Sequence, residues 1–188
     1  MMTWGEVQRQ ALKKLDLPDQ AFREEYRPAL VQAANEGALL LATAGRPIRR
    51  TALVESQGQP LDLTEQAPDL FRLTGADRLE EGEERPTLDY KWEGEQLWLP
   101  PGTYRLRYDA YEPQLTLDTP EDHTLSLAPE AQALLPLYIA SQLYKHDNVQ
   151  LAVLWRNEFE MGRELLQLEQ RQRGQESGQA AFVAERWF

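Results

Sequence analysis

His146 and Asp147 are adjacent residues whose types could carry acid–base chemistry. A histidine oriented by a carboxylate acts as the general base in many hydrolases. Adjacent residues of a helix point in different directions, however, and no serine or cysteine nucleophile motif accompanies this pair. We therefore expect His146 and Asp147 to belong to a helix-ending turn, and we expect the protein not to be an enzyme.

Metal and cofactor chemistry has equally little support. Asp118, Glu121 and Asp122 could bind calcium, but the run lacks the alternating ligands and the glycine of an EF-hand loop, so we expect a proline-containing turn. The chain has no cysteine and only the histidines His123 and His146, which excludes a thiolate or histidine-rich metal site. Glycine-rich phosphate loops and nucleophile elbows are absent from the sequence. We expect no metal and no cofactor.

The last residues of the chain are the strongest candidates for a binding function. They combine large apolar side chains with an arginine, the residue types that usually anchor protein interfaces: Phe182, Val183, Arg186, Trp187 and Phe188. The polar, glycine-containing segment 172–179 precedes them and is typical of a disordered or extended linker. We predict that residues 172–188 form a tail that docks on another subunit. Packing on its own chain, or disorder, is the alternative.

The charge of the chain limits its partners. The formal net charge is −11, and acidic residues dominate between Glu55 and Glu95. Proteins that grip nucleic acid phosphates need clustered lysine and arginine, so the charge argues against this class, and a solvated acidic face is the ordinary explanation. No apolar run is long enough to span a membrane and no signal peptide is recognisable, so we expect a soluble protein that is not secreted by that route.

Two helical regions should flank the middle of the chain. Thr3 and Glu6 have the spacing of a capping box, which predicts a helix over about 4–15. A second long helix should begin at Pro28, because the residue before a proline avoids the helical region, and should end at Gly45. Gly37 and the alanines around it would permit close approach by a neighbouring helix.

A helical hairpin is predicted over residues 127–168, where apolar residues recur at helical spacing. Its first helix should start near Pro129 and be kinked by Pro136, which removes a backbone hydrogen bond. Asp147 or Asn148 can cap the second helix, which we expect to run over about 149–171.

From residue 48 to residue 127 the pattern has the period of two that is typical of strands. The clearest strand covers 103–111. We also expect strands over 48–55, 69–74 and 123–127, a hairpin from 88–92 and 96–99, and an acidic loop over 76–86. The predicted fold class is α+β. Residues 1–47 and 128–171 form a helical bundle of about four helices, 48–127 an inserted antiparallel β-sandwich-like domain, and 172–188 an extended tail.

Three phrases of the sequence suggest a family. They are Pro-Gly-Thr-Tyr-Arg-Leu-Arg-Tyr-Asp-Ala-Tyr at 101–111, Asp-Thr-Pro-Glu-Asp at 118–122, and Leu-Leu-Pro-Leu-Tyr-Ile-Ala-Ser-Gln-Leu-Tyr-Lys-His-Asp-Asn at 134–148. Together with the helix, sheet, helix order, they resemble the head-tail connector (adaptor) proteins of tailed bacteriophages and prophages, over roughly residues 26–166. The acidic segment 76–86 is not part of that pattern, and none of the phrases is a catalytic signature.

The resemblance implies a structural virion protein at the head-tail interface, assembled in the host cytoplasm. It implies a homo-oligomeric ring, commonly twelve-fold, beneath the portal protein and above a tail or head-completion protein. The bundle would form the channel side, the β domain would lie at the periphery or toward the tail, and the C-terminal segment would dock on the portal. Double-stranded DNA would pass through an acidic ring without specific binding.

Two other function classes remain open from the sequence. The first is a β-sandwich binding module of a phage tail that recognises carbohydrate or a host surface through Tyr90, Trp92 and Trp98. Aromatic residues that alternate along strands usually belong to a core, which disfavours it. The second is an enzyme that uses His123 or His146, for which no accompanying motif exists.

Overall fold

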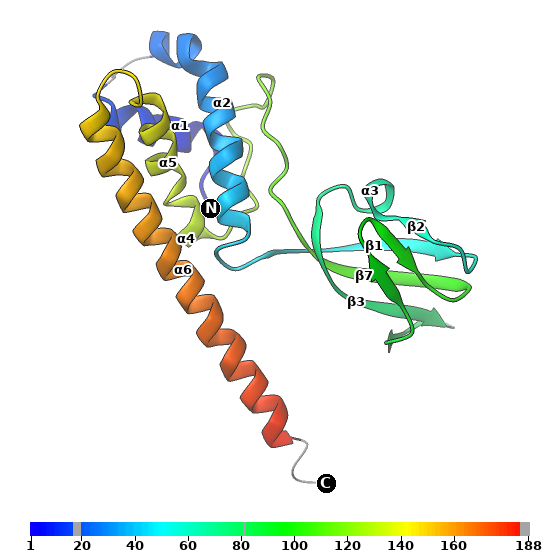
Figure 1. The fold of residues 1–188 in the computed structure, drawn as a ribbon. Coiled ribbons are helices and arrows are strands. Elements are labelled where there is room, and N and C mark those ends of the chain that lie inside the picture. The colour runs from blue at the N-terminus through cyan, green and yellow to red at the C-terminus, as the bar shows by residue number, and fades with distance from the viewer. Residues whose placement is uncertain (17–19, 81, 185–188) are drawn as a thin grey trace. The chain divides into compact units, whose positions relative to one another are not determined.

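The chain has an α+β fold made of two compact units (Figure 1). The computed structural model describes the backbone of residues 1–16, 20–80 and 82–184, and the side chains of residues 1–16, 24–80 and 82–172. One unit, the helical unit, consists of Met1–Pro47 and Glu112–Phe188. The other, the β unit, is Ile48–Tyr111. The predicted fold class is thus confirmed at the level of mixed helix and antiparallel sheet.

Helix α1 (Trp4–Lys14) begins at the predicted capping box. The Thr3 hydroxyl accepts a hydrogen bond from the Glu6 backbone N–H at 3.3 Å, and the Glu6 carboxylate accepts one from the Thr3 N–H at 2.8 Å. These two bonds satisfy backbone donors that the first helical turn leaves free. The buried face of α1 then follows at helical spacing, with Trp4, Val7 and Ala11 fully buried.

Helix α2 (Gln20–Ala42) contradicts the prediction of a start at Pro28, because it runs through that proline. A proline inside a helix removes one hydrogen bond, here the bond to the carbonyl of Glu24. Both Pro28 and Glu24 are exposed, so water can take the place of the missing donor. The helix closes as expected near Gly45, whose N–H donates to the Leu41 carbonyl at 3.3 Å.

The predicted kink at Pro136 is a complete break between α4 (Pro129–Gln132) and α5 (Leu135–Leu143). Pro136 lies in the first turn of α5, where a missing N–H costs no hydrogen bond. A short turn therefore separates two helices where a single bent helix was expected.

Helix α6 (Val149–Ala184) begins after Asn148, whose side-chain oxygen accepts the Leu151 N–H at 3.2 Å. Asn148 is thus the capping residue of the two that were considered. The backbone is helical to Ala184, which corrects the expectation of an extended linker over 172–179. Glutamine, arginine and glutamate are good helix formers, and adding them to an existing helix avoids the cost of nucleation.

Helix α5 lies at the centre of the helical unit and packs against α1, α2 and α6. Two glycines allow the close approach. A Cβ at Gly37 of α2 would lie 2.7 Å from Leu135 Cδ1 and 2.9 Å from the Tyr138 ring, and a Cβ at Gly162 of α6 would lie 2.5 Å from Leu134 Cδ2. The expected role of Gly37 in close helix packing is therefore confirmed.

The segment 112–127 belongs to the helical unit, although the sequence analysis assigned it to the β domain. It packs along the N-terminus: the N–H groups of Trp4 and Gly5 donate to the carbonyls of His123 and Glu121, both at 2.8 Å. The expected strand over 123–127 is reduced to an isolated bridge between Thr3 and Thr124. A β pattern in the sequence cannot indicate which partner its backbone will find.

Gln132 and Glu112 hold this segment from inside the unit. The fully buried Gln132 side chain accepts the Met2 N–H at 2.6 Å and donates to the Leu125 and Leu127 carbonyls at 3.0 and 2.6 Å. The Glu112 carboxylate accepts the N–H groups of Ser126 and Leu127 at 2.8 and 2.6 Å. Backbone N–H and C=O groups of the segment thus have side-chain hydrogen-bond partners in place of the neighbouring strand that they would have in a sheet.

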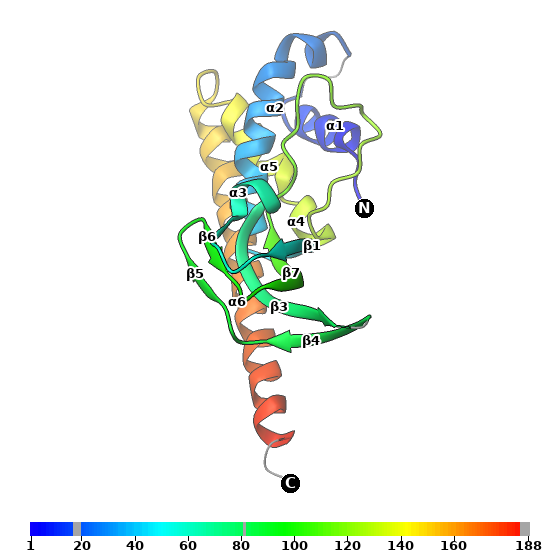
Figure 2. The same cartoon turned by 90° about the vertical axis from the view of Figure 1, so that its right-hand side faces the viewer.

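The β unit contains two antiparallel sheets (Figure 2). The larger has the order β1-β7-β3-β4 and the smaller the order β2-β6-β5, with the short helix α3 after β2. Their bounds are β1 Ile48–Ser56, β2 Leu61–Asp62, α3 Leu63–Gln66, β3 Leu70–Glu80, β4 Glu83–Thr87, β5 Lys91–Glu93, β6 Gln96–Trp98 and β7 Gly102–Ala110.

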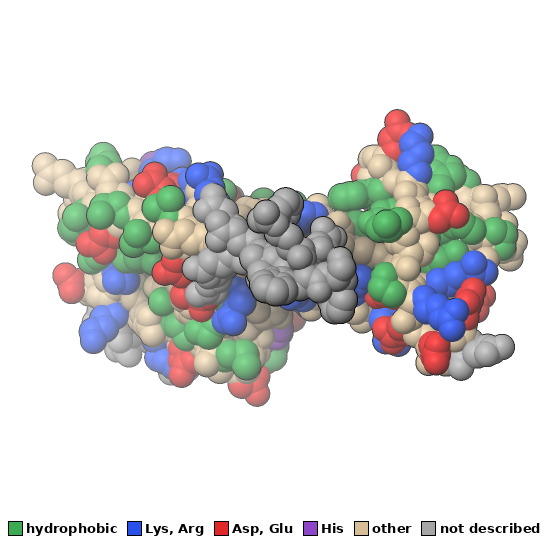
Figure 3. Space-filling model, turned by 90° about the horizontal axis from the view of Figure 1, so that it is seen from below, with side chains coloured by type: hydrophobic (Ala, Val, Ile, Leu, Met, Phe, Trp, Pro, Cys, Tyr) green, Lys and Arg blue, Asp and Glu red, His purple; other side chains and the backbone are tan. Residues whose placement is uncertain are grey.

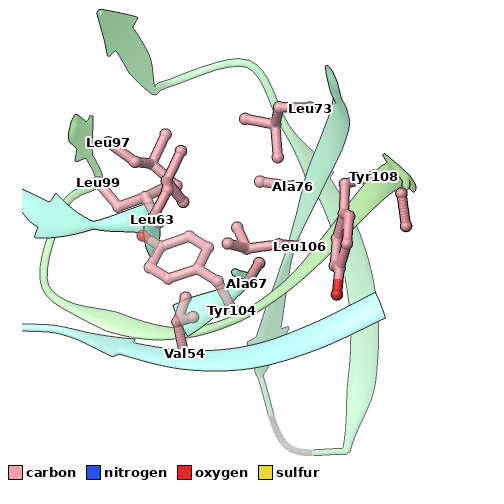
Figure 4. Close-up of a cluster of buried hydrophobic side chains, with 11 residues drawn as sticks. Val54, Leu63, Ala67, Leu73, Ala76, Leu97, Leu99, Tyr104, Leu106 and Tyr108 are labelled. Atoms are coloured by element: carbon pink, nitrogen blue, oxygen red, sulfur yellow. The ribbon is translucent and has the colours of Figure 1, made fainter. Parts of the chain in front are cut away.

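Strand β7 confirms the clearest strand of the sequence analysis, because Tyr104, Leu106, Tyr108 and Ala110 are all buried on one side. Both sheets contribute to one hydrophobic core. Figure 4 shows Tyr104 and Leu106 among Val54 of β1 and the leucines of the smaller sheet and its flanks, Leu63, Leu97 and Leu99. The alternating pattern of β7 is thus the centre of this unit.

The expected acidic loop over 76–86 is wrong, because most of it is the β3–β4 hairpin. The turn includes Gly82, whose φ of +86° suits glycine. Two acidic side chains of this hairpin pair with arginines on strand β7. Asp77 lies 2.8 Å from the Arg107 guanidinium, and Glu84 pairs with Arg105. Cross-strand ion pairs thus allow a sequence of few apolar residues to form a strand.

We expect Gly37→Ala to lower the free energy of unfolding, because the Tyr138 ring is held between helices and cannot move away. Overpacking costs about 1 to 3 kcal/mol, against about 1 kcal/mol of helix propensity that alanine gains over glycine. Gly45→Ala is the matched control, since its Cβ would have no contact closer than 3.5 Å. Urea unfolding of both variants measures the difference, and equal midpoints would contradict the packing described.

Gln132→Leu should cost about 2 to 4 kcal/mol of stability, because it leaves buried backbone groups of Met2, Leu125 and Leu127 without partners. Gln10→Leu, at an exposed position of α1, is expected to change stability by less than about 0.5 kcal/mol. Amide hydrogen exchange should also show faster exchange over 121–127 in the Gln132 variant alone. Unchanged exchange there would contradict the anchoring role of Gln132.

Candidate functional site

The acid–base candidates lie in a turn, as expected from the sequence. His146 and Asp147 follow the end of α5 and are exposed, and the N–H groups of Asp147 and Asn148 donate to the Tyr144 carbonyl at 3.2 and 3.0 Å. The pair thus connects α5 to α6.

The acidic residues near 118–122 also form a turn. The Thr116 N–H donates to the Thr119 hydroxyl at 2.8 Å, and the Asp118 N–H donates to the Thr116 hydroxyl at 3.3 Å. Glu121 supplies its carbonyl to the N-terminus of α1. Across the described side chains, no three His, Cys, Asp or Glu residues come together in a group that could hold a metal ion.

The aromatic residues considered for carbohydrate binding do not form one exposed platform. Tyr90 packs against the core of the β unit. In the register of the β5–β6 hairpin, Trp92 lies opposite Leu97 and Trp98 lies opposite Lys91. Successive positions along a strand point to opposite faces, so Trp92 and Trp98 lie on opposite faces of the hairpin. Trp98 carries the Lys91 ammonium 5.3 Å from its ring centroid, while Trp92 is 39% exposed.

The main polar cluster inside the helical unit is centred on Tyr138 of α5. Its hydroxyl donates to the Glu36 carboxylate of α2 at 3.2 Å, and the Arg156 guanidinium of α6 lies 5.0 Å from its ring centroid. Phe159 meets the same ring edge-on at 5.0 Å. Burial raises the pKa of the Tyr138 hydroxyl above its usual range; the nearby Glu36 charge adds to this and Arg156 opposes it. This cluster joins α2, α5 and α6 and was not recognised from the sequence.

A shallow groove of about 330 Å³ lies between α5 and α6. Its walls are apolar, with Val149, Ala152 and Val153, and its polar edge carries the cations Lys145 and Arg156. Arg156 is already engaged by Glu160 at 2.6 Å and by the aromatic rings of Tyr138 and Phe159. Ser141 also lines the groove, but its hydroxyl donates to the Tyr138 carbonyl at 2.7 Å. The lining residues include no carboxylate that could act as a base for it.

The structure describes only part of the segment that was predicted to dock on a partner. The backbone of Phe182 and Val183 belongs to the last turns of α6. Their side chains, together with Arg186, Trp187 and Phe188, lie outside the described residues. Over the surface drawn in Figure 3, the described acidic and basic side chains are interspersed with hydrophobic ones.

Comparison with known proteins adds no assignment: no protein-family model matches the chain, and no curated protein is significantly similar to it in sequence. Within the described residues, no helix combines the length and the apolar character needed to cross a lipid bilayer.

The Tyr138 cluster predicts a dependence of stability on alkaline pH. A tyrosine ionises near pH 10 when unfolded, whereas folded Tyr138 keeps its proton to higher pH. Above about pH 10 the unfolded state therefore binds fewer protons, and the free energy of unfolding falls as pH rises. Tyr138→Phe should reduce this slope, measured by urea unfolding between neutral and alkaline pH. An unchanged slope would contradict the assignment.

Proposed function

We propose that this protein is a structural virion protein, a ring-forming head-tail adaptor that joins the portal to the tail and surrounds the passage for double-stranded DNA. The observation that supports this best is the division of the chain. Both ends of the sequence contribute to one helical unit, and a separate β unit is inserted between them. This organisation agrees with the one implied by the resemblance of segments 101–111 and 134–148 to connector proteins.

Each part has a role in this proposal. The helical unit acts as a bundle on the channel side of the ring. The β unit acts as a sandwich-like domain at the periphery or toward the tail-side neighbour. Helix α6 carries Phe182 and Val183 away from the α5 core, and these residues dock on the portal together with Arg186, Trp187 and Phe188.

The charge of the protein fits a passage that does not retain DNA. A net charge of −11 repels phosphate, so DNA would pass without the counterion release that drives tight binding. In the described part of the chain, the hydroxyl of the groove residue Ser141 is bonded to the Tyr138 carbonyl, and the positions considered for acid–base or calcium chemistry form turns. The proposed role accordingly needs no catalysis and no cofactor, and it places the protein in the virion after assembly in the host cytoplasm.

Binding to a portal protein tests the proposal directly. Native mass spectrometry of the full chain with a portal ring should give a complex that contains a ring of this protein. A chain ending at Arg171 should lose that complex, because the predicted anchors are removed, while its urea midpoint stays close to that of the full chain. Full-length Trp187→Ala with Phe188→Ala is the matched variant without truncation. A full chain that neither forms rings nor binds a portal would overturn the proposal.

A further inference from the structure

Helix α6 carries a second apolar face, on the side opposite the core. We name it the outer seam and define it as Leu154, Met161, Leu165 and Leu168, whose side chains are 46%, 66%, 61% and 51% exposed. The core side of the same helix is formed by Ala152, Phe159 and Leu166, which are buried. At 100° per residue, Met161 and Leu168 point almost directly away from Phe159. A surface helix normally has a polar side there.

The outer seam lacks a cover within the described part of its own unit. Helix α6 has 36 residues whereas α5 has nine, and α6 extends past the other helices of the unit (Figure 1). Between residues 167 and 172 none of the described side chains is buried. A projecting helix without packing is only marginally stable in water, and a continuous row of large apolar side chains is typical of an interaction surface.

The spacing of the outer seam suits another helix that lies alongside it. Leu154, Met161 and Leu168 are seven residues apart, and a seven-residue repeat keeps a straight line along two helices that cross at about 20°. The three residues of this repeat are symmetric about Met161, because Leu154 and Leu168 are equidistant from it, whereas the position that mirrors Leu165 is Asn157. A two-fold axis at Met161 would therefore place Leu154 of one copy beside Leu168 of a second copy running in the opposite direction.

Charges beside the outer seam decide the direction of pairing. In a parallel pair, Glu164 of each copy would face Glu169 of the other, which places like charges together on both edges. In an antiparallel pair centred on Met161, Asn157 faces Glu164 of the second copy, so that an amide N–H can donate to a carboxylate. The antiparallel arrangement replaces a repulsion by a hydrogen bond.

We infer that the outer seam binds a second copy of this chain through an antiparallel α6–α6 contact centred on Met161. Such a contact is isologous and closes with two copies, so it is distinct from the head-to-tail contacts that build a ring. It does not rest on the proposed adaptor function.

Single cysteine variants test both the partner and the direction, because the chain has no cysteine of its own. Met161→Cys should form a disulfide-linked dimer under mild oxidation, since two copies of position 161 meet at the axis. Leu154→Cys alone and Leu168→Cys alone should not, but a mixture of the two should give the linked heterodimer. Leu39→Cys on α2, also an exposed leucine, is the matched control and should not become disulfide-linked. Self-linkage of all three seam variants would indicate a parallel pair and overturn the inference.

Sedimentation equilibrium of the full chain measures the same contact without cross-linking. Met161→Glu should raise the dimer dissociation constant at least tenfold, because two carboxylates would meet at the axis. At a protein concentration where both chains are monomeric, its unfolding midpoint should equal that of the wild type, since the side chain is exposed. Leu39→Glu should leave the dimer intact. A wild-type chain that stays monomeric, or a seam contact made only with a portal protein, would overturn the inference. Rings that persist in Met161→Glu while the two-fold dimer is lost would support the inference, because the seam contact is distinct from the contacts that build a ring.

Discussion

The close packing of α5 is the constraint on which the helical unit depends. This short helix contacts α1, α2 and α6, and two of these contacts require a residue without a side chain, Gly37 and Gly162. Because the backbones come so near, the Tyr138 ring can reach Glu36 on one neighbour and Arg156 on the other. Steric fit and one polar cluster together set the direction in which α6 leaves the unit.

That direction connects the core with the surfaces where partners are expected. Residues of α6 that face α5 are buried, and the opposite side of the same helix exposes the outer seam. Helix α6 also carries the C-terminal anchors of the proposed portal contact. A rigid helix can present two such surfaces at a defined spacing, which an extended linker could not do.

The β unit depends on a different balance of forces. Tyr104, Leu106 and Tyr108 supply an apolar side to β7, while its other side carries arginines that pair with acids of β3 and β4. Asp109 is almost fully buried beside Arg72, and Asp77 is buried beside Arg107. Within the acidic stretch between Glu55 and Glu95, Asp77, Glu80, Glu83 and Glu84 pair with arginines of the same sheet.

The sequence by itself determined the α+β class, the capping box of α1 and the direction of the side chains of β7, because each follows from spacing along a single element. It also limited the cap of α6 to Asp147 or Asn148, and the structure selected Asn148. Tertiary structure alone decided that α2 passes through Pro28, that 76–86 is a hairpin and that 112–127 joins the helices. The carbonyl left without a donor by Pro28 belongs to an exposed turn of α2, where solvent can reach it. In the other two cases the partners are arginines on another strand and the side chains of Gln132 and Glu112. Such partners are distant in sequence, and a local pattern contains no information about them.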